Sequence, residues 1–323
     1  MSGAIESLDK EADRSWQVNL FSCPTCRGAL TSERSETESY SCASGHSFPV
    51  IRGIPRFVGS DMYVDSFSFE WNTHNTTQLD SHQGGDSSEE MFRIKTGLTP
   101  EQVKGKLVLD AGVGAGRFSD VLARWGAHVV GVDLSYAVEA SYQNFKDLHN
   151  VVIAQADIGS LPFSDGTFDF IVSIGVLHHT PSTKEYFKKL VPLLKPGGSI
   201  AIWVYPDAGD YVTRAQWIPF THRIPDKMFY EWCRWFVPLA NKFRTTNLVQ
   251  WLSKVFPFSY QGLGTENDIL DTFDGYSPRY HGIHSVVEVM EWFRESGLIN
   301  IREPGNWITS VRGDRPGFES SNL

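Results

Sequence analysis

The chain has 323 residues, a formal net charge of −9 at pH 7 and four cysteines. This length predicts about two domains and can bury an ample core. The acidic balance disfavours a broad nucleic-acid surface, which normally requires a basic face, but it does not exclude a local contact. No apolar run approaches the ~20 residues of a membrane-spanning helix, and residues 1–19 are too polar for a signal peptide. These features predict a soluble cytoplasmic protein.

The first folded unit that the sequence predicts is a small metal-binding segment at residues 20–60, here called the ribbon. Cys23 and Cys26 have two residues between them, and Cys42 and His46 have three. Two short turns that each supply two such ligands suit tetrahedral Zn²⁺. A disulfide is the alternative, but three clustered cysteines pair badly and a cytoplasmic enzyme is kept reduced. We therefore predict a structural zinc ion on these four residues, with His46 the ligand most open to replacement.

Residues 61–98, here called the arm, connect the ribbon to the next unit. Apolar and polar residues alternate over residues 67–71, which indicates a strand or a packed extended segment. Glycine and polar residues at positions 82–88 predict a flexible turn. Packing is the expected role of Trp71.

The most informative pattern lies at residues 108–116, which read Val-Leu-Asp-Ala-Gly-Val-Gly-Ala-Gly. An apolar strand runs into Gly112, Gly114 and Gly116, and a helix is expected over residues 117–125. Glycines at the carboxyl end of a strand allow positive φ angles and let a ligand approach the main chain. The pattern predicts a binding turn for a nucleotide-type cofactor.

The residues around this turn narrow the class of cofactor. The spacing departs from the Gly-x-Gly-x-x-Gly of dinucleotide folds, and the Gly-Lys-Ser/Thr of a phosphate loop is absent from the turn. A second strand at residues 128–132 ends in Asp133, whose carboxylate can accept both hydrogen bonds from a ribose diol. A cofactor with a ribose is therefore expected.

Three further motifs follow in order over about a hundred residues. Asp157 and Ile158 follow a third strand, a fourth strand at residues 168–174 leads into His178 and His179, and Pro-Gly-Gly at 196–198 precedes a fifth. In this order the chain resembles the class I S-adenosylmethionine (SAM)-dependent methyltransferases. The resemblance implies SAM as cofactor, at Asp110, Gly112, Gly114, Gly116, Asp133, Leu134, Asp157, Ile158 and Ser173.

The same resemblance and the alternation of strands with amphipathic segments predict one architecture. We expect an α/β fold with a doubly wound, Rossmann-like, seven-stranded sheet. Residues 99–205 would form the SAM-binding core, residues 283–313 its last helix and hairpin, and residues 314–323 a tail. In related enzymes an arm closes over the methionine end of SAM, which makes Trp71 and Gln78 weak candidates for cofactor contacts.

Residues 206–282 form an insertion after the fifth strand, here called the lid. Between positions 214 and 254 it carries seven basic residues against two acidic ones, interleaved with nine aromatic residues. Pro219, Pro225 and Pro238 are expected to break it into short helices. Such insertions lie beside the transferable methyl group in this fold, so the segment is expected to cover the acceptor. Its basic, aromatic surface also suits a membrane interface or stacked bases, although most of its aromatic residues are expected to pack.

Methyl transfer to oxygen or nitrogen requires a group that accepts one proton. His178 and His179 follow the fourth strand at the edge where the acceptor must lie, and an imidazole base would have a pKa near ~6.5. A polar cluster between Asp271 and His284 is the alternative source of the base. His284 is also expected to cap the helix that begins after Ser285.

The sequence leaves more than one acceptor class open. A small molecule, such as a specialised metabolite or a glycan precursor, fits the acidic balance and the aromatic lid, with O- or N-methylation favoured over C-methylation. An rRNA or tRNA base is the alternative, because residues 20–60 resemble the zinc ribbon of rRNA guanine-N1 methyltransferases through Gly45-His46-Ser47-Phe48. A non-catalytic or lipid-surface protein is the third interpretation. The sequence does not fix the oligomeric state.

Overall fold

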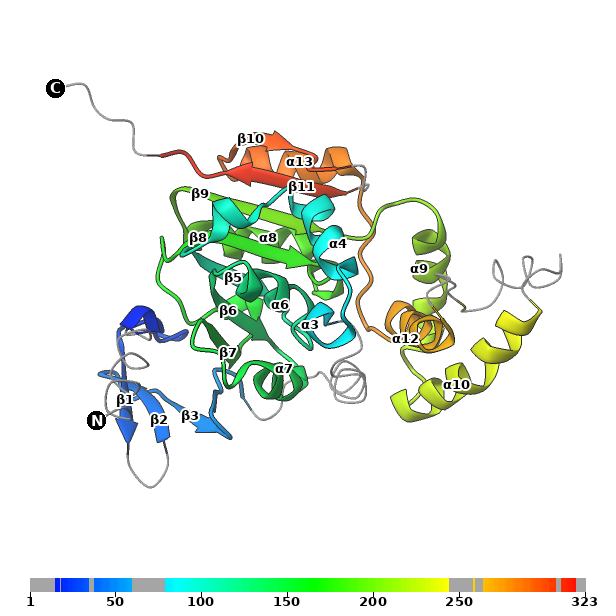
Figure 1. Cartoon of the computed structure of the whole chain (residues 1–323), viewed down its shortest axis with the longest axis horizontal. Coiled ribbons are helices and arrows are strands. Elements are labelled where there is room, and N and C mark those ends of the chain that lie inside the picture. The colour runs from blue at the N-terminus through cyan, green and yellow to red at the C-terminus, as the bar shows by residue number, and fades with distance from the viewer. Residues whose placement is uncertain are drawn as a thin grey trace.

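The computed structural model describes residues 15–17, 19–34, 38–59, 79–243, 258, 264–305 and 309–317. Within these ranges the chain forms a small four-stranded sheet and a larger seven-stranded sheet. Figure 1 shows the small sheet beside the β7 end of the large one, with the lid helices on the opposite side of the molecule. Residues 61–78 of the arm, which include Trp71 and Gln78, lie outside the described residues.

The large sheet has the order β10-β11-β9-β8-β5-β6-β7. The five strands from β5 to β9 are parallel. At one edge of the sheet, β11 runs antiparallel to both of its neighbours, β9 and β10. This arrangement confirms the predicted doubly wound, Rossmann-like architecture. The strands are β5 (Leu107–Ala111), β6 (His128–Asp133), β7 (Val151–Gln155), β8 (Phe168–Ile174), β9 (Leu194–Trp203), β10 (Ile299–Arg302) and β11 (Ser310–Asp314).

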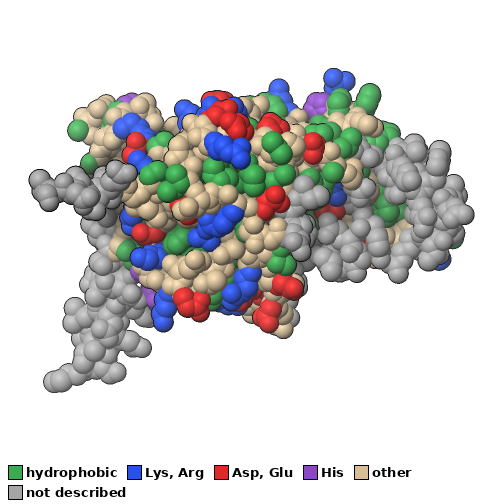
Figure 2. Space-filling model, turned by 90° about the horizontal axis from the view of Figure 1, so that it is seen from above, with side chains coloured by type: hydrophobic (Ala, Val, Ile, Leu, Met, Phe, Trp, Pro, Cys, Tyr) green, Lys and Arg blue, Asp and Glu red, His purple; other side chains and the backbone are tan. Residues whose placement is uncertain are grey.

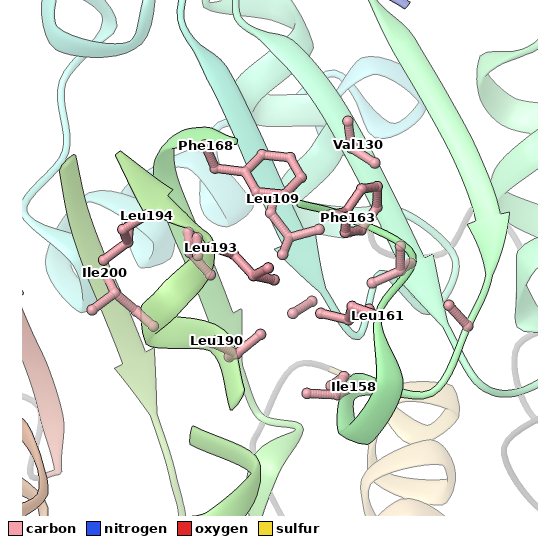
Figure 3. Close-up of a cluster of buried hydrophobic side chains, with 14 of the residues drawn as sticks. Leu109, Val130, Ile158, Leu161, Phe163, Phe168, Leu190, Leu193, Leu194 and Ile200 are labelled. Carbon is pink, nitrogen blue, oxygen red and sulfur yellow. The ribbon is translucent and has the colours of Figure 1, made fainter. Parts of the chain in front are cut away.

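Helices cover both faces of this sheet, which explains why its central strands are nearly continuous apolar runs. One buried cluster joins the sheet to α4, α5, α6 and α7, and another joins it to α8 and α13. Figure 3 shows the second cluster, where Leu109 and Val130 of neighbouring strands face Phe163 and Phe168. The helices are α3 (Asp80–Gln83), α4 (Ser87–Thr96), α5 (Pro100–Val103), α6 (Arg117–Arg124), α7 (Ala137–Phe145), α8 (Thr183–Leu190) and α13 (Val286–Glu295), with short 3-10 turns η1 (Ser15–Gln17), η2 (Ile158–Ser160), η3 (Leu177–His179) and η4 (Val191–Leu193).

Two local expectations need correction. The flexible turn expected at 82–88 is narrower, because α3 extends to Gln83 and α4 already begins at Ser87. Gly84, with φ 70°, ends α3 in the left-handed conformation that glycine tolerates. The cap of α13 is Ser285, whose hydroxyl accepts a hydrogen bond from the Glu288 amide, so His284 is not its cap.

The ribbon packs directly onto the core. Its antiparallel strands are β1 (Leu30–Arg34), β2 (Glu38–Cys42), β3 (Ser47–Ile51) and β4 (Ile54–Pro55). Phe21 stacks on Phe163 of the core with ring centroids 5.8 Å apart, and the Phe57 amide donates to the Gln155 carbonyl at the end of β7 at 2.8 Å. The ribbon therefore covers the β7 edge of the large sheet, which would otherwise present unpaired backbone groups.

The lid forms a third cluster around α9 (Asp210–Thr221), α10 (Asp226–Lys242) and α12 (Thr265–Tyr276). The expectation that Pro219 and Pro238 end helices is wrong, because both lie inside a helix. Pro219 lies in the last turn of α9, and the carbonyl that Pro238 leaves without a helical donor belongs to Arg234, which is exposed to water. In the part of the chain that the structure describes, no helix has the length and apolarity to span a bilayer.

Candidate functional site

The glycine turn at residues 112–116 has the backbone conformation that the sequence predicts. Gly112, Gly114 and Gly116 have φ angles of 95°, 52° and 102°. A Cβ on Gly112 would lie 2.3 Å from a methyl group of Val176, and one on Gly116 would lie 2.2 Å from the Phe145 ring. Larger residues would therefore be strained at these positions and would also clash with the core.

Asp133, at the end of β6, is fastened to this turn. One carboxylate oxygen accepts a hydrogen bond from the Gly114 amide at 3.0 Å, and the other accepts from the Ser135 amide at 2.9 Å and its hydroxyl at 2.7 Å. Burial raises the pKa of Asp133, while these hydrogen bonds stabilise its charged form. The expected ribose acid thus lies against the expected cofactor turn.

Two of the predicted cofactor residues, Asp110 and Ser173, have side chains that form hydrogen bonds within the protein. Asp110 is buried and accepts a hydrogen bond from the Ser119 hydroxyl of α6 at 2.7 Å. Burial raises the pKa of Asp110 to about 7. The fully buried Ser173 hydroxyl donates to the Ala111 carbonyl at 2.8 Å. These contacts hold β5, β8 and α6 in place around the turn.

The remaining predicted cofactor residues lie at the ends of β6 and β7. The Leu134 carbonyl accepts a hydrogen bond from the Gln155 side chain at 2.8 Å. Asp157 begins η2, where its carboxylate accepts from the Gly159 amide at 2.8 Å, and Ile158 is buried beside it. Because these strands are parallel, all of these residues share one edge of the sheet with the glycine turn.

The structure brings the four predicted zinc ligands together. The ligand atoms of Cys23, Cys26, Cys42 and His46 lie within 4.8 Å of one another. The distances are 3.6 Å between Cys23 Sγ and His46 Nδ1, 3.6 Å between the Cys26 and Cys42 sulfurs, and 3.3 Å between Cys42 Sγ and His46 Nδ1. Usual zinc–ligand bonds of ~2.0–2.3 Å place tetrahedral ligands roughly 3.5–3.8 Å apart. The cluster therefore fits a closed tetrahedral zinc site.

The knuckle around the first two cysteines has the backbone geometry of such a site. The Cys26 amide points at the Cys23 sulfur at 3.4 Å, which would stabilise a thiolate. Arg27 has a positive φ of 62°, and its amide donates to the Cys23 carbonyl at 2.8 Å, which closes the turn. A Cβ on Gly28 would lie 3.4 Å from the Cys26 sulfur.

His178 is poorly suited to accept a proton. It is fully buried and stacks on Tyr205 with ring centroids 3.6 Å apart. Its Nδ1 accepts a hydrogen bond from the Tyr205 amide at 3.3 Å, so in the neutral ring the proton resides on Nε2. Burial also holds the pKa of His178 well below its usual value. The ring is neutral and its accepting nitrogen is already in use.

His179 has the opposite tautomer. Its Nδ1 lies 3.0 Å from the Tyr280 carbonyl, to which it must donate, so the lone pair is on Nε2. Burial lowers the pKa of His179 to about 3. The expectation of an imidazole pKa near ~6.5 is therefore wrong for both histidines, because their rings are packed beneath the lid rather than open to water.

A buried polar cluster from the lid meets the core beside these histidines, and its pairing was not predicted. Arg214 of α9 is buried and forms an ion pair with Asp271 of α12 at 2.8 Å. Asp274, one helical turn further along α12, has its pKa raised to about 7, mainly by burial. Burial raises the pKa of Tyr205, the residue stacked on His178, and the charge of Asp274 raises it further. This cluster meets the core at Tyr211, whose ring centroid lies 5.3 Å from the Arg214 guanidinium carbon and 4.5 Å from that of Tyr205.

A cavity of about 360 Å³ opens where the lid rejoins the core. His284 lines it, with Nε2 2.9 Å from the Thr183 hydroxyl and Nδ1 3.1 Å from Glu288. The other lining residues are Thr180, Pro181, Ser182, Lys184, Tyr280, His281, Gly282 and Trp292.

Lys95 is a further residue that the sequence did not single out. Its ammonium group is buried and lies 3.3 Å from the centroid of the Trp203 ring at the end of β9. Burial holds the pKa of Lys95 well below its usual value. The sequence around this lysine of the arm has no pattern that distinguishes it from a lysine exposed to water. Only the fold therefore reveals this contact.

The chain is similar in sequence to known methyltransferases. Demethylmenaquinone methyltransferase of Clavibacter sepedonicus is 32% identical over 116 residues, which cover 36% of this chain and 47% of that protein. Chloroplastic tocopherol O-methyltransferase of Arabidopsis thaliana is 32% identical over 193 residues, 53% of each chain. The chain thus spans about half the length of these curated relatives. A SAM-dependent methyltransferase structure from Aquifex aeolicus aligns with 16% identity and a TM-score of 0.41, over 71% of this chain and 97% of that chain. Residues 109–202 match the family described as a methyltransferase domain.

Proposed function

We propose that the protein is a SAM-dependent methyltransferase that acts on a small-molecule acceptor. The observation that carries this proposal is the glycine turn held by Asp133 at the carboxyl edge of a parallel sheet. Backbone amides, a ribose-binding carboxylate and neighbouring strand ends occur there together, as a nucleoside-containing cofactor requires. The match of residues 109–202 to the methyltransferase domain supports the same cofactor.

We propose that SAM contacts Gly112, Gly114, Gly116, Asp133 and the segment from Asp157. Asp110 and Ser173 would act as positioning residues, because their side chains are buried as well as hydrogen-bonded within the protein. SAM would supply a methyl group already activated by its sulfonium. The protein would then have to align the acceptor at about 3 Å and accept its proton. We propose that the lid helps to align the acceptor and that its junction with the core supplies the proton acceptor.

Small molecules are favoured as acceptors over nucleic acids. The two curated relatives are named for demethylmenaquinone and tocopherol, which are small molecules. Acidic and basic side chains are interspersed on the molecular face in Figure 2, in line with the net charge of −9. An rRNA or tRNA base is the second candidate, favoured by the cysteine–histidine cluster of the ribbon. We propose that this cluster binds structural zinc in either case.

The test is to incubate purified protein with methyl-labelled SAM and a fractionated cell extract. We expect the label to enter the small-molecule or lipid fraction. Label confined to RNA would favour the second candidate, and no transfer to any fraction, despite SAM binding, would contradict a catalytic role. A variant with Asp133 replaced by alanine controls for labelling that does not depend on the proposed site.

The proton acceptor is proposed to be Asp274, with His179 as the alternative. A base must be deprotonated to act, so the rate rises with pH through its pKa. Burial raises the pKa of Asp274 to about 7 and lowers that of His179 to about 3. We therefore expect kcat to rise through about pH 7 and Asp274→Asn to remove that inflection together with most of the turnover. A pH-independent rate between pH 6 and 9 that is lost in His179→Ala would identify His179 instead.

A further inference from the structure

The outer surface of the lid carries large apolar side chains that face water. On α10, Met228 is 65% exposed, Trp235 67% and Leu239 43%. Their spacing of seven and four residues places them along one stripe of the helix. Phe220 in the last turn of α9 and Ile224 just before α10 are also exposed, at 65% and 38%. These five residues are here called the outer stripe.

The outer stripe lies outside the buried cluster of the lid. The opposite side of α10 carries the buried Phe229, Cys233 and Val237, which pack on Phe273 of α12. Figure 1 shows α12 between α10 and the large sheet, so α10 is the outermost of the described lid helices. One side of α10 thus packs inside the lid, and the apolar residues on its other side are exposed to solvent. A large exposed apolar patch usually marks a binding surface.

Basic residues flank this stripe. Arg223, Lys227, Arg234 and Lys242 are all exposed between residues 220 and 243. The acids in this stretch are Asp226 and Glu231, and Glu231 lies 3.1 Å from Arg234. The surface therefore has a positive local charge on a protein whose net charge is −9. In a symmetric dimer joined through this surface, the basic residues of the two copies would face each other and repel.

We propose that the outer stripe docks on the surface of an anionic phospholipid bilayer. A helix with Trp, Leu and Phe on one side and Lys and Arg beside them lies in the plane of a membrane interface, where the apolar side enters the headgroup boundary. Tryptophan is enriched at that depth, and each basic residue near an anionic surface adds electrostatic attraction. The charge complementarity favours lipid phosphates over an uncharged protein groove.

This docking would place the lid against the bilayer while the core remains in water. The proposal that the acceptor is then drawn from the membrane rests on the methyltransferase function proposed above. Docking itself does not rest on that function, so the two can fail separately.

The experiment is co-sedimentation of the full-length protein with vesicles of phosphatidylcholine, and with equimolar phosphatidylcholine and phosphatidylglycerol. We expect binding to the anionic vesicles that weakens with added salt. The double variant Met228→Asp/Trp235→Asp should reduce the partition coefficient at least about tenfold, because it replaces two apolar side chains that enter the interface. Lys227→Glu/Lys242→Glu should remove the preference for phosphatidylglycerol.

The matched control is Val287→Asp, which changes a 69% exposed apolar residue on α13 of the core. It should bind vesicles like the parent protein. Equal binding by the parent and by the Met228/Trp235 variant would overturn the proposal. A dimer of the parent protein that the Met228/Trp235 variant no longer forms, as measured by light scattering, would also overturn it, because the outer stripe would then join two copies. SAM affinity is measured in parallel: vesicle binding without SAM binding supports docking and contradicts the proposed function, and the reverse result overturns docking alone.

Discussion

Replacing Asp133 with alanine is expected to lower the affinity for SAM by about 30-fold to 1000-fold. The change would remove the two charge-assisted hydrogen bonds that we propose Asp133 accepts from the ribose, worth together roughly 2 to 4 kcal/mol. It also removes the acceptor of the Gly114 amide at 3.0 Å, which releases the glycine turn from β6. Isothermal titration calorimetry with SAM measures the effect directly, and thermal unfolding shows whether the fold survives.

Two further variants separate these contributions. Asp133→Asn keeps an oxygen for the Gly114 amide but loses the charge and one acceptor, so its loss of affinity should be smaller. Asp147→Ala removes an exposed carboxylate just beyond α7 and should leave the affinity unchanged. Parental affinity in Asp133→Ala, with a normal unfolding transition, would contradict the assignment of the cofactor site.

The parallel sheet and the glycine turn could be predicted because their causes are local in sequence. Apolar runs that alternate with helical periodicity specify buried parallel strands, and positive φ angles at Gly112 and Gly116 require glycine. The cysteine–histidine cluster could be predicted for a similar reason, since each pair of its residues lies on one short turn. In these cases the spacing itself encodes the geometry.

Other features depend on contacts between residues far apart in the chain. Arg56 is buried where the ribbon meets the core, and it donates to Gln155 at 3.1 Å and pairs with Glu139. Arg214 and Asp271 meet in the same way within the lid. No periodicity in the sequence links such partners. The sequence also does not distinguish an arginine that becomes buried from one that stays exposed to water. The low pKa values of His178 and His179 were missed for this reason, because burial by the lid sets them.

Removal of the ribbon zinc is expected to have the second large effect, on stability rather than on chemistry. Apparent zinc-binding energies of about 10–16 kcal/mol in small zinc domains match or exceed the roughly 5–15 kcal/mol stability of a typical domain. The double variant Cys23→Ser/Cys26→Ser should therefore lose its zinc and unfold residues 20–59. Elemental analysis should find one zinc ion per chain in the parent protein and none in the variant.

The effect should extend into the core, because the two units share buried residues. Phe21 and Phe57 of the ribbon belong to the same cluster as Phe163 and Leu161 of the core. Unfolding of the ribbon would expose that surface and the β7 edge, so we expect a lower unfolding temperature for the whole protein and faster proteolysis near residues 155–165. Cys233→Ser, in the lid, is the matched control and should retain full zinc. A zinc-free parent protein, or full zinc in the double variant, would contradict the proposed zinc site. Zinc loss with unchanged core stability would show that the ribbon folds independently.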